Sequence, residues 1–502
     1  MGEPGIGKTQ ALEVERSKIV SKIQEQGDQV LFLDLRSYRS EGRLVRSLFD
    51  SPEFKAWQAG THRLHIFLDS FDECLLRVDT LSTLLVDEFK RYQNAVHRLC
   101  LRIACRTAIW QPVLEEGLKE IWGENSVGVY ELAPLRRIDI IEAAKAKRCF
   151  PDDFLKEVHQ KNIVPLAIKP ITLGFLLNTY DRHGGRFPPN QKFHELYLEG
   201  CKLLCEEINE SRRGSNRRGN FDVDQRLIVA SRIAAITIFA NRFAVWTGVD
   251  QGNVPIEDAL LQKLCHGYEN ANGREFEITR VVIEEVLDTG LFSSRGLHRM
   301  GWAHQTYAEF LAAWYLVQHE MPLAQITGLI FSSEEPDYKL IPQLHETAAW
   351  IASIRMDVRQ EIIETDPDVL LRSDIPTDSD LREAIVTSLL TQYEQEKLYD
   401  YERKQYRNYG KLKHPGLANQ LCPYICDSSK QIDARVLAIH IAEFCEVSEL
   451  QKELADLTLD SSQSVYFRVS ATKALCSIGD VGTRLSLKPF KKLQINGGLA
   501  HL

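Results

Sequence analysis

A glycine-rich motif at the start of the 502-residue chain constrains its fold more than any other feature. The pattern G-x-x-x-x-G-K-[ST] is matched at every fixed position by Gly2-Glu3-Pro4-Gly5-Ile6-Gly7-Lys8-Thr9. Glycines let such a loop turn its backbone N–H groups toward a phosphate, at the positive end of the helix that follows. An apolar helical spacing does follow, at Leu12, Ile19 and Ile23. The motif therefore predicts a phosphate-binding loop, in which Lys8 reaches the phosphates and the Thr9 hydroxyl binds Mg²⁺.

Short apolar runs alternate with helical stretches over residues 1–135. The runs that we predict as strands are Val30–Leu35, Leu64–Asp69, Leu99–Cys105 and Val127–Leu132. Their apolarity is continuous rather than alternating, which is typical of parallel strands that helices cover on both faces. We therefore expect an α/β layered domain built on a parallel sheet.

The beginning of the phosphate loop departs from the usual arrangement. Such a loop normally starts from a buried strand, and this sequence has no residues before Met1 that could form one. We therefore expect a core that lacks its first strand. A loop attached to a free terminus would be mobile, and ordering its residues costs about 1–2 kcal/mol each. The sequence thus predicts weak nucleotide binding by residues 1–502 alone.

Carboxylates gather where the second predicted strand ends. Asp69 closes the apolar run, and Asp72 and Glu73 follow the small residue Ser70. In a parallel sheet this position faces the phosphate loop, so Asp69 is a candidate ligand of the Mg²⁺. Asp72 and Glu73 could orient or deprotonate an attacking water. An acidic turn after a strand can also be an ordinary exposed loop, but its position downstream of a phosphate loop favours a site.

Arg106 follows the third predicted strand and should lie at the same edge of the sheet. Its guanidinium could contact the γ-phosphate and stabilise the charge that develops during phosphoryl transfer. The alternative is a surface arginine that begins a loop.

An acidic box of the form D-[small]-x-D-E after a phosphate loop resembles the motifs of NACHT-type STAND NTPases, the signal-transducing ATPases with numerous domains. Two later segments are similar to the same family. Val164–Leu173 resembles its helical-domain segment, and the resemblance implies that Pro170 packs near the adenine. Trp302–Tyr315 is similar to the family's aromatic-x-His…EFLAA segment, which implies that His304 meets the phosphates of bound ADP.

The residues after His304 also have an interpretation that needs no family. They form one apolar helical face, at Tyr307, Phe310, Leu311, Trp314 and Tyr315. That spacing by itself indicates only a buried helix. A lone histidine before such a face is commonly a structural residue, so the contact with ADP rests on the resemblance. One position departs from the family pattern, because Thr107 stands where proline is usual.

The resemblance covers residues 2–320, and together with an internal repeat it implies a series of modules. We expect a P-loop NTPase (NACHT) core over 1–135, a helical domain over 136–220, a winged-helix-like module over 221–335, a HEAT-like α-solenoid over 336–482, and an irregular tail over 483–502. A repeat predicts the solenoid, since Ala434-Arg435-Val436-Leu437-Ala438 aligns with Phe467-Arg468-Val469-Ser470-Ala471, 33 residues later. This period is typical of stacked helix pairs.

The function that the resemblance implies is a nucleotide-dependent signalling switch with ATPase activity, as in bacterial antiphage defence. ADP would hold a closed monomer, a protein ligand on the solenoid would release it, and ATP with Mg²⁺ would support self-oligomerisation. A second hypothesis is a non-hydrolysing helical scaffold with a broken ATPase core. A third, an AAA-type remodelling ATPase, would need an arginine finger and a second sensor that we do not find in the sequence.

Composition narrows the partners and the compartment. The chain has 61 Lys and Arg against 70 Asp and Glu, and the resulting net charge of −9 disfavours a general polyanion binder. The basic stretch Arg212–Asn220 could contact nucleic acid, but a solvated loop between helices explains it equally well.

The 11 cysteines form no C-x-x-C motif and are expected to be buried thiols. No apolar stretch is long enough to span a bilayer, so we expect a cytoplasmic protein without a membrane partner.

Overall fold

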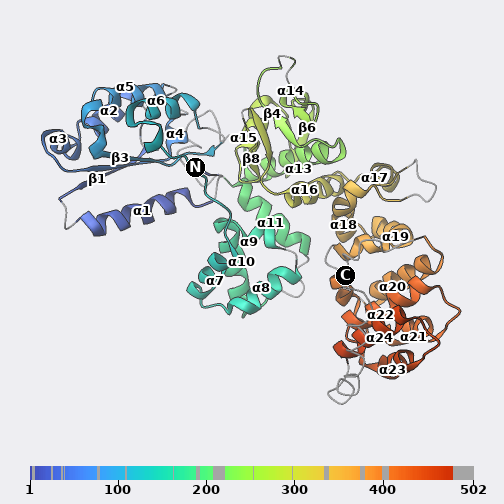
Figure 1. The fold of residues 1–502 in the computed structure, drawn as a ribbon. Coiled ribbons are helices and arrows are strands. Elements are labelled where there is room, and N and C mark those ends of the chain that lie inside the picture. The colour runs from blue at the N-terminus through green and yellow to red at the C-terminus, as the bar shows by residue number, and fades with distance from the viewer. Residues whose placement is uncertain are drawn as a thin grey trace. The chain divides into compact units, whose positions relative to one another are not determined.

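The computed structural model describes residues 1–2, 6–23, 27–35, 38, 40–75, 78, 80–107, 110–161, 163–187, 193–206, 221–250, 252, 254–296, 298–332, 339–372, 379–397 and 406–478. Within these ranges the side chains of residues 73, 193, 372, 406 and 407 are not described. The predictions for Glu3, Pro4, Gly5, the Glu73 side chain, the basic stretch 212–220 and the tail 483–502 therefore lie outside the described residues. The chain divides into two compact units, Met1–Tyr315 and Leu316–Leu502 (Figure 1).

A three-stranded parallel sheet forms the first part of unit 1. Its strands are β1 (Gln29–Asp34), β2 (Leu64–Asp69) and β3 (Leu99–Ile103), in the order β1-β2-β3. Three of the predicted strands and their parallel pairing are thus confirmed. Asp34 and Asp69 are partners in the register, so the carboxyl ends of β1 and β2 meet at one edge.

The fourth predicted strand is wrong as a strand, although the segment lies beside the sheet. Val127–Leu132 has no regular strand structure, and its hydrogen bonds run to the first residue of the chain. The Met1 ammonium donates to the Tyr130 carbonyl at 2.6 Å, and the Leu132 N–H donates to the Met1 carbonyl at 2.9 Å. A single residue as partner gives one bridge rather than a ladder, and this explains the missing strand.

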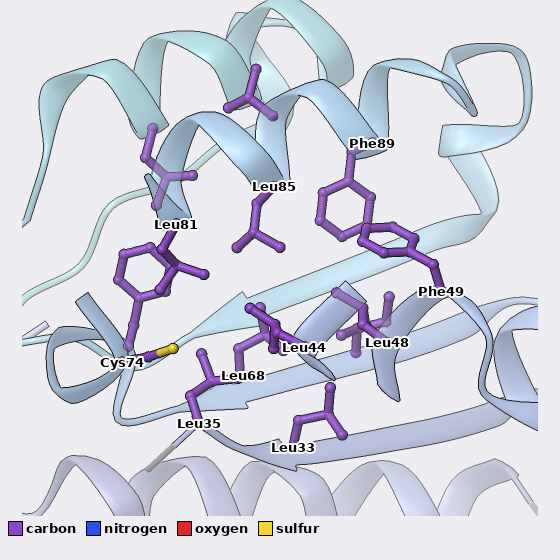
Figure 2. Close-up of a cluster of buried hydrophobic side chains, with 14 of the residues drawn as sticks. Leu33, Leu35, Leu44, Leu48, Phe49, Leu68, Cys74, Leu81, Leu85 and Phe89 are labelled. Carbon is purple, nitrogen blue, oxygen red and sulfur yellow. The ribbon is translucent and has the colours of Figure 1, made fainter. Parts of the chain in front are cut away.

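Helices pack mainly on one face of this sheet. The helices on that face are α2 (Glu41–Phe49), α3 (Pro52–Ala59), α5 (Leu81–Lys90) and α6 (Pro112–Trp122). Figure 2 shows part of the resulting apolar cluster, in which Leu68 of the sheet faces Leu85 and Phe89 of α5. The helix α1 (Lys8–Ile23) lies on the opposite side and buries none of its residues (Figure 1). Helices therefore lie on both faces of the sheet, as expected, but only one face is packed against buried helical side chains.

Short helices and strands make up the rest of unit 1. The helices are α4 (Phe71–Leu75), α7 (Arg137–Ala146), α8 (Pro151–Gln160), α9 (Val164–Ala167), α10 (Pro170–Arg182), α11 (Phe193–Cys205), α13 (Val223–Phe239), α14 (Leu261–Leu264), α15 (Arg280–Leu287) and α16 (Gln305–Gln318), which continues into unit 2. The strands are β4 (Ala244–Trp246), β5 (Asp258–Leu260), β8 (Phe292–Ser294) and β9 (Arg299–Trp302) in one mixed sheet, and β6 (Tyr268–Ala271) and β7 (Arg274–Glu277) in a hairpin. The sequence pattern missed these strands because three or four residues are too few to show a period of two.

Unit 2 is helical in its described parts, apart from one isolated bridge between Phe331 and Leu340. Its helices are α17 (Leu323–Ile330), α18 (His345–Ile354), α19 (Met356–Thr365), α20 (Ser379–Glu394), α21 (Leu417–Cys426), α22 (Ile432–Phe444), α23 (Gln451–Leu459) and α24 (Val465–Ile478). The repeat that the sequence suggested corresponds to two successive helix pairs, α21 with α22 and α23 with α24.

The two aligned arginines of the repeat have the same structural role. Each is the fourth residue of its helix and donates to carbonyl groups at the end of the helix before it. Arg435 Nε donates to the Tyr424 carbonyl at 3.3 Å, and Arg468 Nε donates to the Thr458 carbonyl at 2.9 Å. The last carbonyls of a helix have no partner inside it, so a positive donor at this position stabilises the pair. Arg435 also lies 4.2 Å from the centre of the Phe467 ring, which joins one pair to the next.

Two further sequence expectations concern the cysteines and the membrane. All 11 cysteines are free thiols. The expectation that they are buried is confirmed for five of them, whereas four are partly buried and Cys426 and Cys476 are exposed. Of the helices in the described ranges, none combines the length and the apolarity that crossing a bilayer requires.

We expect Arg435→Ala to lower the free energy of unfolding of unit 2 by about 1.5–3 kcal/mol, because it removes charged hydrogen bonds to buried carbonyls. Arg435→Lys should recover only part of this, since an ammonium cannot contact two carbonyls as a guanidinium does. Denaturant titration of the full chain measures the effect. Lys452→Ala, which removes an exposed cation from α23, is the control. An equal effect of Arg435→Ala and Lys452→Ala would contradict this role of the arginine.

Candidate functional site

The structure brings the phosphate-loop motif and the acidic strand end together. Thr9, in the first turn of α1, donates its hydroxyl to Asp69 Oδ2 at 3.0 Å. Asp69 is the last residue of β2 and is almost completely buried. The two residues are 60 positions apart in the sequence, and the contact exists because α1 starts at the edge where β2 ends. A hydroxyl and a carboxylate side by side are the two protein ligands that a phosphate-loop Mg²⁺ site uses.

The described residues of this motif include a glycine in a backbone conformation that favours glycine. Gly7 has φ +94°, a left-handed conformation that favours glycine, and its carbonyl accepts the first helical hydrogen bond from Ala11 N–H at 2.9 Å. A Cβ atom on Gly2 would lie 2.7 Å from Ile6 Cγ2, so the chain folds back tightly on itself. Lys8 Nζ donates to the Gly2 carbonyl at 2.8 Å and thus lies across the loop.

The start of the loop is held by neighbours on both sides. The Gly2 N–H donates to the Cys105 carbonyl at 3.3 Å, just beyond β3, while Met1 is bonded to Tyr130 and Leu132 as described above. Met1 and Gly2 therefore lie between the end of β3 and the segment around residue 131. The premise that the loop hangs from a free terminus is wrong for these two residues.

Asp72 and Arg106 are engaged with each other. The Asp72 carboxylate accepts from the backbone N–H of Arg106 at 3.2 Å, and its second oxygen lies 3.2 Å from Arg106 Nε. Both side chains are buried, with exposed fractions of 3% for Asp72 and 10% for Arg106. Arg106 Nη1 also donates to the Asp288 carbonyl at 2.6 Å, at the end of α15. The two residues predicted to handle water and the γ-phosphate thus form a buried ion pair that ties the first sheet to α15.

A turn with unusual backbone geometry positions Asp72. Ser70 has φ +59°, which is uncommon for a residue other than glycine, and it turns the chain from β2 into α4. The continuation of β3 stabilises this turn, because the Ala104 carbonyl accepts from Phe71 N–H at 3.0 Å. Next to it, burial and then the charge of Asp72 raise the pKa of the Cys105 thiol far above its ordinary value. Both effects favour the uncharged form of the Cys105 thiol.

Pro170 lies against the phosphate loop. Its Cγ would be 3.7 Å from a Cβ atom placed on Gly7. Pro170 is the first residue of α10, and the preceding Lys169 is buried with an exposed fraction of 5%. Lys169 Nζ donates to the Gly290 carbonyl and lies 6.0 Å from the centre of the Tyr307 ring. The start of α10 thus connects the loop to the segment that contains His304.

His304 is half-buried at the start of α16. The Thr306 N–H donates to its Nδ1 at 3.2 Å, so the neutral ring carries its proton on Nε2. Burial, and then the charge of Lys169, lower the pKa of His304, which keeps the ring neutral near pH 7. His304 therefore presents an N–H donor close to a buried cation. Tyr307, one turn later, donates its hydroxyl to the Pro165 carbonyl at 2.6 Å.

Sequence reasoning missed two charged residues of this region. Asp34 ends β1 opposite Asp69, and the same signal that identified Asp69, a carboxylate at the end of an apolar strand, could have found it. Lys169 directly precedes Pro170 inside the segment that carries the resemblance, yet nothing in its spacing indicated a buried cation.

The residues fit a nucleotide with Mg²⁺ in chemistry and in number. Within the described ranges, no three His, Cys, Asp or Glu side chains gather closely enough to hold a metal ion by themselves. A magnesium ion is usually held by one or two protein ligands together with substrate phosphates. Thr9 and Asp69 supply such a pair, and Lys8 supplies a cation for the phosphates.

Comparison with known proteins does not identify a family. No protein-family model matches the chain, and no curated protein matches it. The NACHT-type assignment therefore rests on the motifs and stays a prediction.

We expect Asp72→Asn to lower the free energy of unfolding by about 3–5 kcal/mol, because it leaves the Arg106 charge buried without its partner. Asp50→Asn is the matched control, since its ion pair with Lys55 is exposed and worth at most about 1 kcal/mol. The double variant Asp72→Asn/Arg106→Gln should lose less than the sum of the single changes. Denaturant titration compares wild type with Asp72→Asn, Arg106→Gln, the double variant and Asp50→Asn, and additive losses would contradict the pairing.

The lowered pKa of His304 predicts a pH dependence. The folded protein binds a proton on His304 more weakly than the unfolded chain does. The neutral ring therefore contributes fully to the free energy of unfolding above the ordinary pKa of 6.5, and this contribution is lost as the pH falls below that value. His65 has a lowered pKa for similar reasons, burial and then Arg102, so wild type must be compared with His304→Gln. We expect the free energy of unfolding to fall less steeply below pH 6.5 in the variant. Equal slopes would show that His304 is not a buried, neutral histidine.

Proposed function

We propose that the protein is an ATP-binding signalling switch of the NACHT-type STAND class. The observation that carries the proposal is the 3.0 Å hydrogen bond between Thr9 and Asp69, which joins the phosphate-loop motif to the acidic strand end. In this proposal residues 1–135 are a P-loop NTPase core, and unit 2 contains a HEAT-like α-solenoid that senses a ligand. The pairs α21–α22 and α23–α24, with equivalent arginines, support the solenoid.

In this proposal, different residues of the loop and its neighbours bind the phosphates and the Mg²⁺ ion. Lys8 exchanges its bond with the Gly2 carbonyl for the phosphate oxygens, which are stronger acceptors because they are charged. Thr9 and Asp69 would hold a Mg²⁺ ion, which would neutralise part of the phosphate charge. The N-terminus of α1 adds its positive dipole end. These residues bind and orient the triphosphate before any chemistry.

Coupling to the rest of unit 1 runs through the start of α10. Pro170 contacts the loop at Gly7, and Lys169 contacts Gly290 and lies near His304. The Nε2–H of His304 is a hydrogen-bond donor, which suits a diphosphate oxygen. A nucleotide that contacts His304 would stabilise the closed form of the protein. A nucleotide that does not contact His304 would favour the open form. A coupling of about 1–3 kcal/mol is typical of such switches. Self-oligomerisation of the released form, a cytoplasmic location and a role in antiphage defence are part of the proposal through the family resemblance.

The buried ion pair favours a second candidate, a helical scaffold that binds nucleotide without hydrolysing it. Asp72 and Arg106 bind each other, so neither is directed at an attacking water or a γ-phosphate in this arrangement. Hydrolysis then needs Glu73 as the base, or it needs Arg106 to leave Asp72 and Asp288. Steady phosphate release from ATP that Glu73→Gln reduces by roughly 10²–10⁴-fold would favour the ATPase. Binding without release would favour the scaffold.

We expect Lys8→Ala to weaken ATP binding by the full chain roughly 10- to 150-fold, the value of a charged hydrogen bond of about 1.5–3 kcal/mol. Asp69→Asn should remove the dependence of binding on Mg²⁺ while retaining part of the affinity. Lys18→Ala, an exposed lysine of the same helix, is the matched control. Calorimetric titration with ATP and with ADP measures both affinities. Wild-type affinity in Lys8→Ala would remove the phosphate-loop assignment.

A further inference from the structure

The mixed sheet of unit 1 carries a cavity that the nucleotide site described above does not include. It has a volume of about 430 Å³, within the range of sites for small ligands. Two of the six side chains that line it are arginines, and none of the six is a carboxylate. The six residues, all in unit 1, are Phe243, Ala244, Arg295, Arg299, Trp302 and Gln305.

Two small residues in neighbouring strands create the hollow. Ala244 of β4 and Gly301 of β9 are partners in the register, so both face the same side of the sheet. A methyl group and a hydrogen atom fill little of the space above the strands. In the same row of the sheet, Asp258 of β5 stands beside Ala244, and Ser293 of β8 stands beside Gly301.

Two arginine side chains cover this row and form the floor of the cavity. Arg299 Nε and Nη2 donate to the two carboxylate oxygens of Asp258, at 2.6 and 2.7 Å. Arg295 lies directly on Gly301, because a Cβ atom there would be 2.7 Å from Arg295 Cγ. Its Nη2 donates to the Trp302 carbonyl at 2.5 Å. Both guanidinium groups are therefore held in place before any ligand arrives.

These contacts leave part of each guanidinium for a ligand. Arg299 Nη1 is reached by solvent and has no hydrogen-bond partner among the described residues. Arg295 is exposed, and the carbonyl that accepts from its Nη2 does not neutralise its charge. The cavity thus offers N–H donors together with a positive charge, and charged donors of this planar kind suit a carboxylate or a phosphate.

The rim of the cavity adds an aromatic surface and the start of a helix. Phe243 directly precedes β4 and has an exposed fraction of 67%. An exposed ring at a cavity is a surface against which a flat ligand ring can stack. Gln305 begins α16, a helix of 14 residues, whose positive dipole end favours a nearby negative charge. Donors for an anion and a surface for a ring therefore lie in one cavity.

We propose that this cavity binds a small aromatic anion, a flat ring that carries a carboxylate or a phosphate. The anionic group accepts from Arg295 and from Arg299 Nη1, and the ring stacks on Phe243. An inorganic phosphate alone would leave the aromatic surface unused, and a neutral ring would leave the charge of Arg295 without a partner. The inference goes beyond the proposed nucleotide switch and does not depend on it.

The test measures binding of two probes to the full chain by ligand-detected NMR titration. Naphthoate represents an aryl carboxylate, and guanosine monophosphate represents a ring that carries a phosphate. We expect saturable binding of at least one of them, and the one that binds more tightly identifies the source of the anion. The uncharged analogues, naphthalenemethanol and guanosine, should bind at least about fivefold more weakly. Affinity should also fall as added salt screens the charges.

Substitutions at exposed residues of the cavity test the two halves of the site. Arg295→Gln should weaken binding of the anionic probe at least about fivefold, and Phe243→Ala should weaken it about twofold to tenfold. Both residues are exposed, so their loss removes little packing. Arg274→Gln and Phe150→Ala make the same changes at exposed positions outside the cavity and should bind the probe like wild type.

Several outcomes would overturn the proposal. These are no saturable binding of either anionic probe, equal affinity for the uncharged analogues, and equal binding by Arg295→Gln and Arg274→Gln. Lys8→Ala should leave the probe affinity unchanged, and a loss there would assign the probe to the phosphate loop instead. Loss of ATP binding in wild type with intact probe binding would remove only the nucleotide proposal.

Discussion

The parallel register of β1, β2 and β3 is the constraint on which the candidate site depends. Parallel strands end at a common edge, so Asp34 and Asp69 stand side by side and the residues after β3 reach the same place. Hydrogen bonds beyond the strands extend this edge, from Ala104 to Leu68 and from Gly2 to Cys105. The phosphate loop thereby starts next to the carboxylates, and α1 leaves the edge with Thr9 against Asp69. An antiparallel sheet would have separated these groups by the length of a strand.

Buried charges connect this edge to the other parts of unit 1. Arg106 bridges Asp72 and the Asp288 carbonyl, and Lys169 joins the start of α10 to Gly290. A buried charge strongly destabilises the fold when it loses its partner. Partly broken contacts of Arg106 or Lys169 are therefore unfavourable. Buried contacts of this kind suit a protein that changes between discrete arrangements. They also suit a rigid scaffold. What distinguishes a switch from a scaffold is whether a bound nucleotide can replace the partners of Arg106 and Lys169.

Sequence reasoning was most successful where a pattern is local. The bounds of β2, Leu64–Asp69, were predicted residue for residue, because a six-residue apolar run between polar residues leaves little choice. The pairing of Thr9 with Asp69 followed from motif chemistry. Predictions failed where the structure of a segment, or the role of a side chain, depends on a residue far away in the sequence. The segment 127–132 is apolar enough for a strand, but among the described residues its backbone hydrogen bonds run to Met1 alone. Asp72 and Arg106 were assigned to water and phosphate from their positions, and only the fold shows that they bind each other.

The sequence by itself determined the phosphate-loop motif, the strands of the first sheet and the spacing of the arginines in the helix pairs. These features depend on side-chain period and on glycine, whose effects act over a few residues. Only the tertiary structure decided that Lys169 is a buried cation near His304, and that Asp72 and Arg106 form a buried ion pair. Burial and hydrogen-bond satisfaction are set by residues far away in the chain, because water competes for every polar group until packing excludes it.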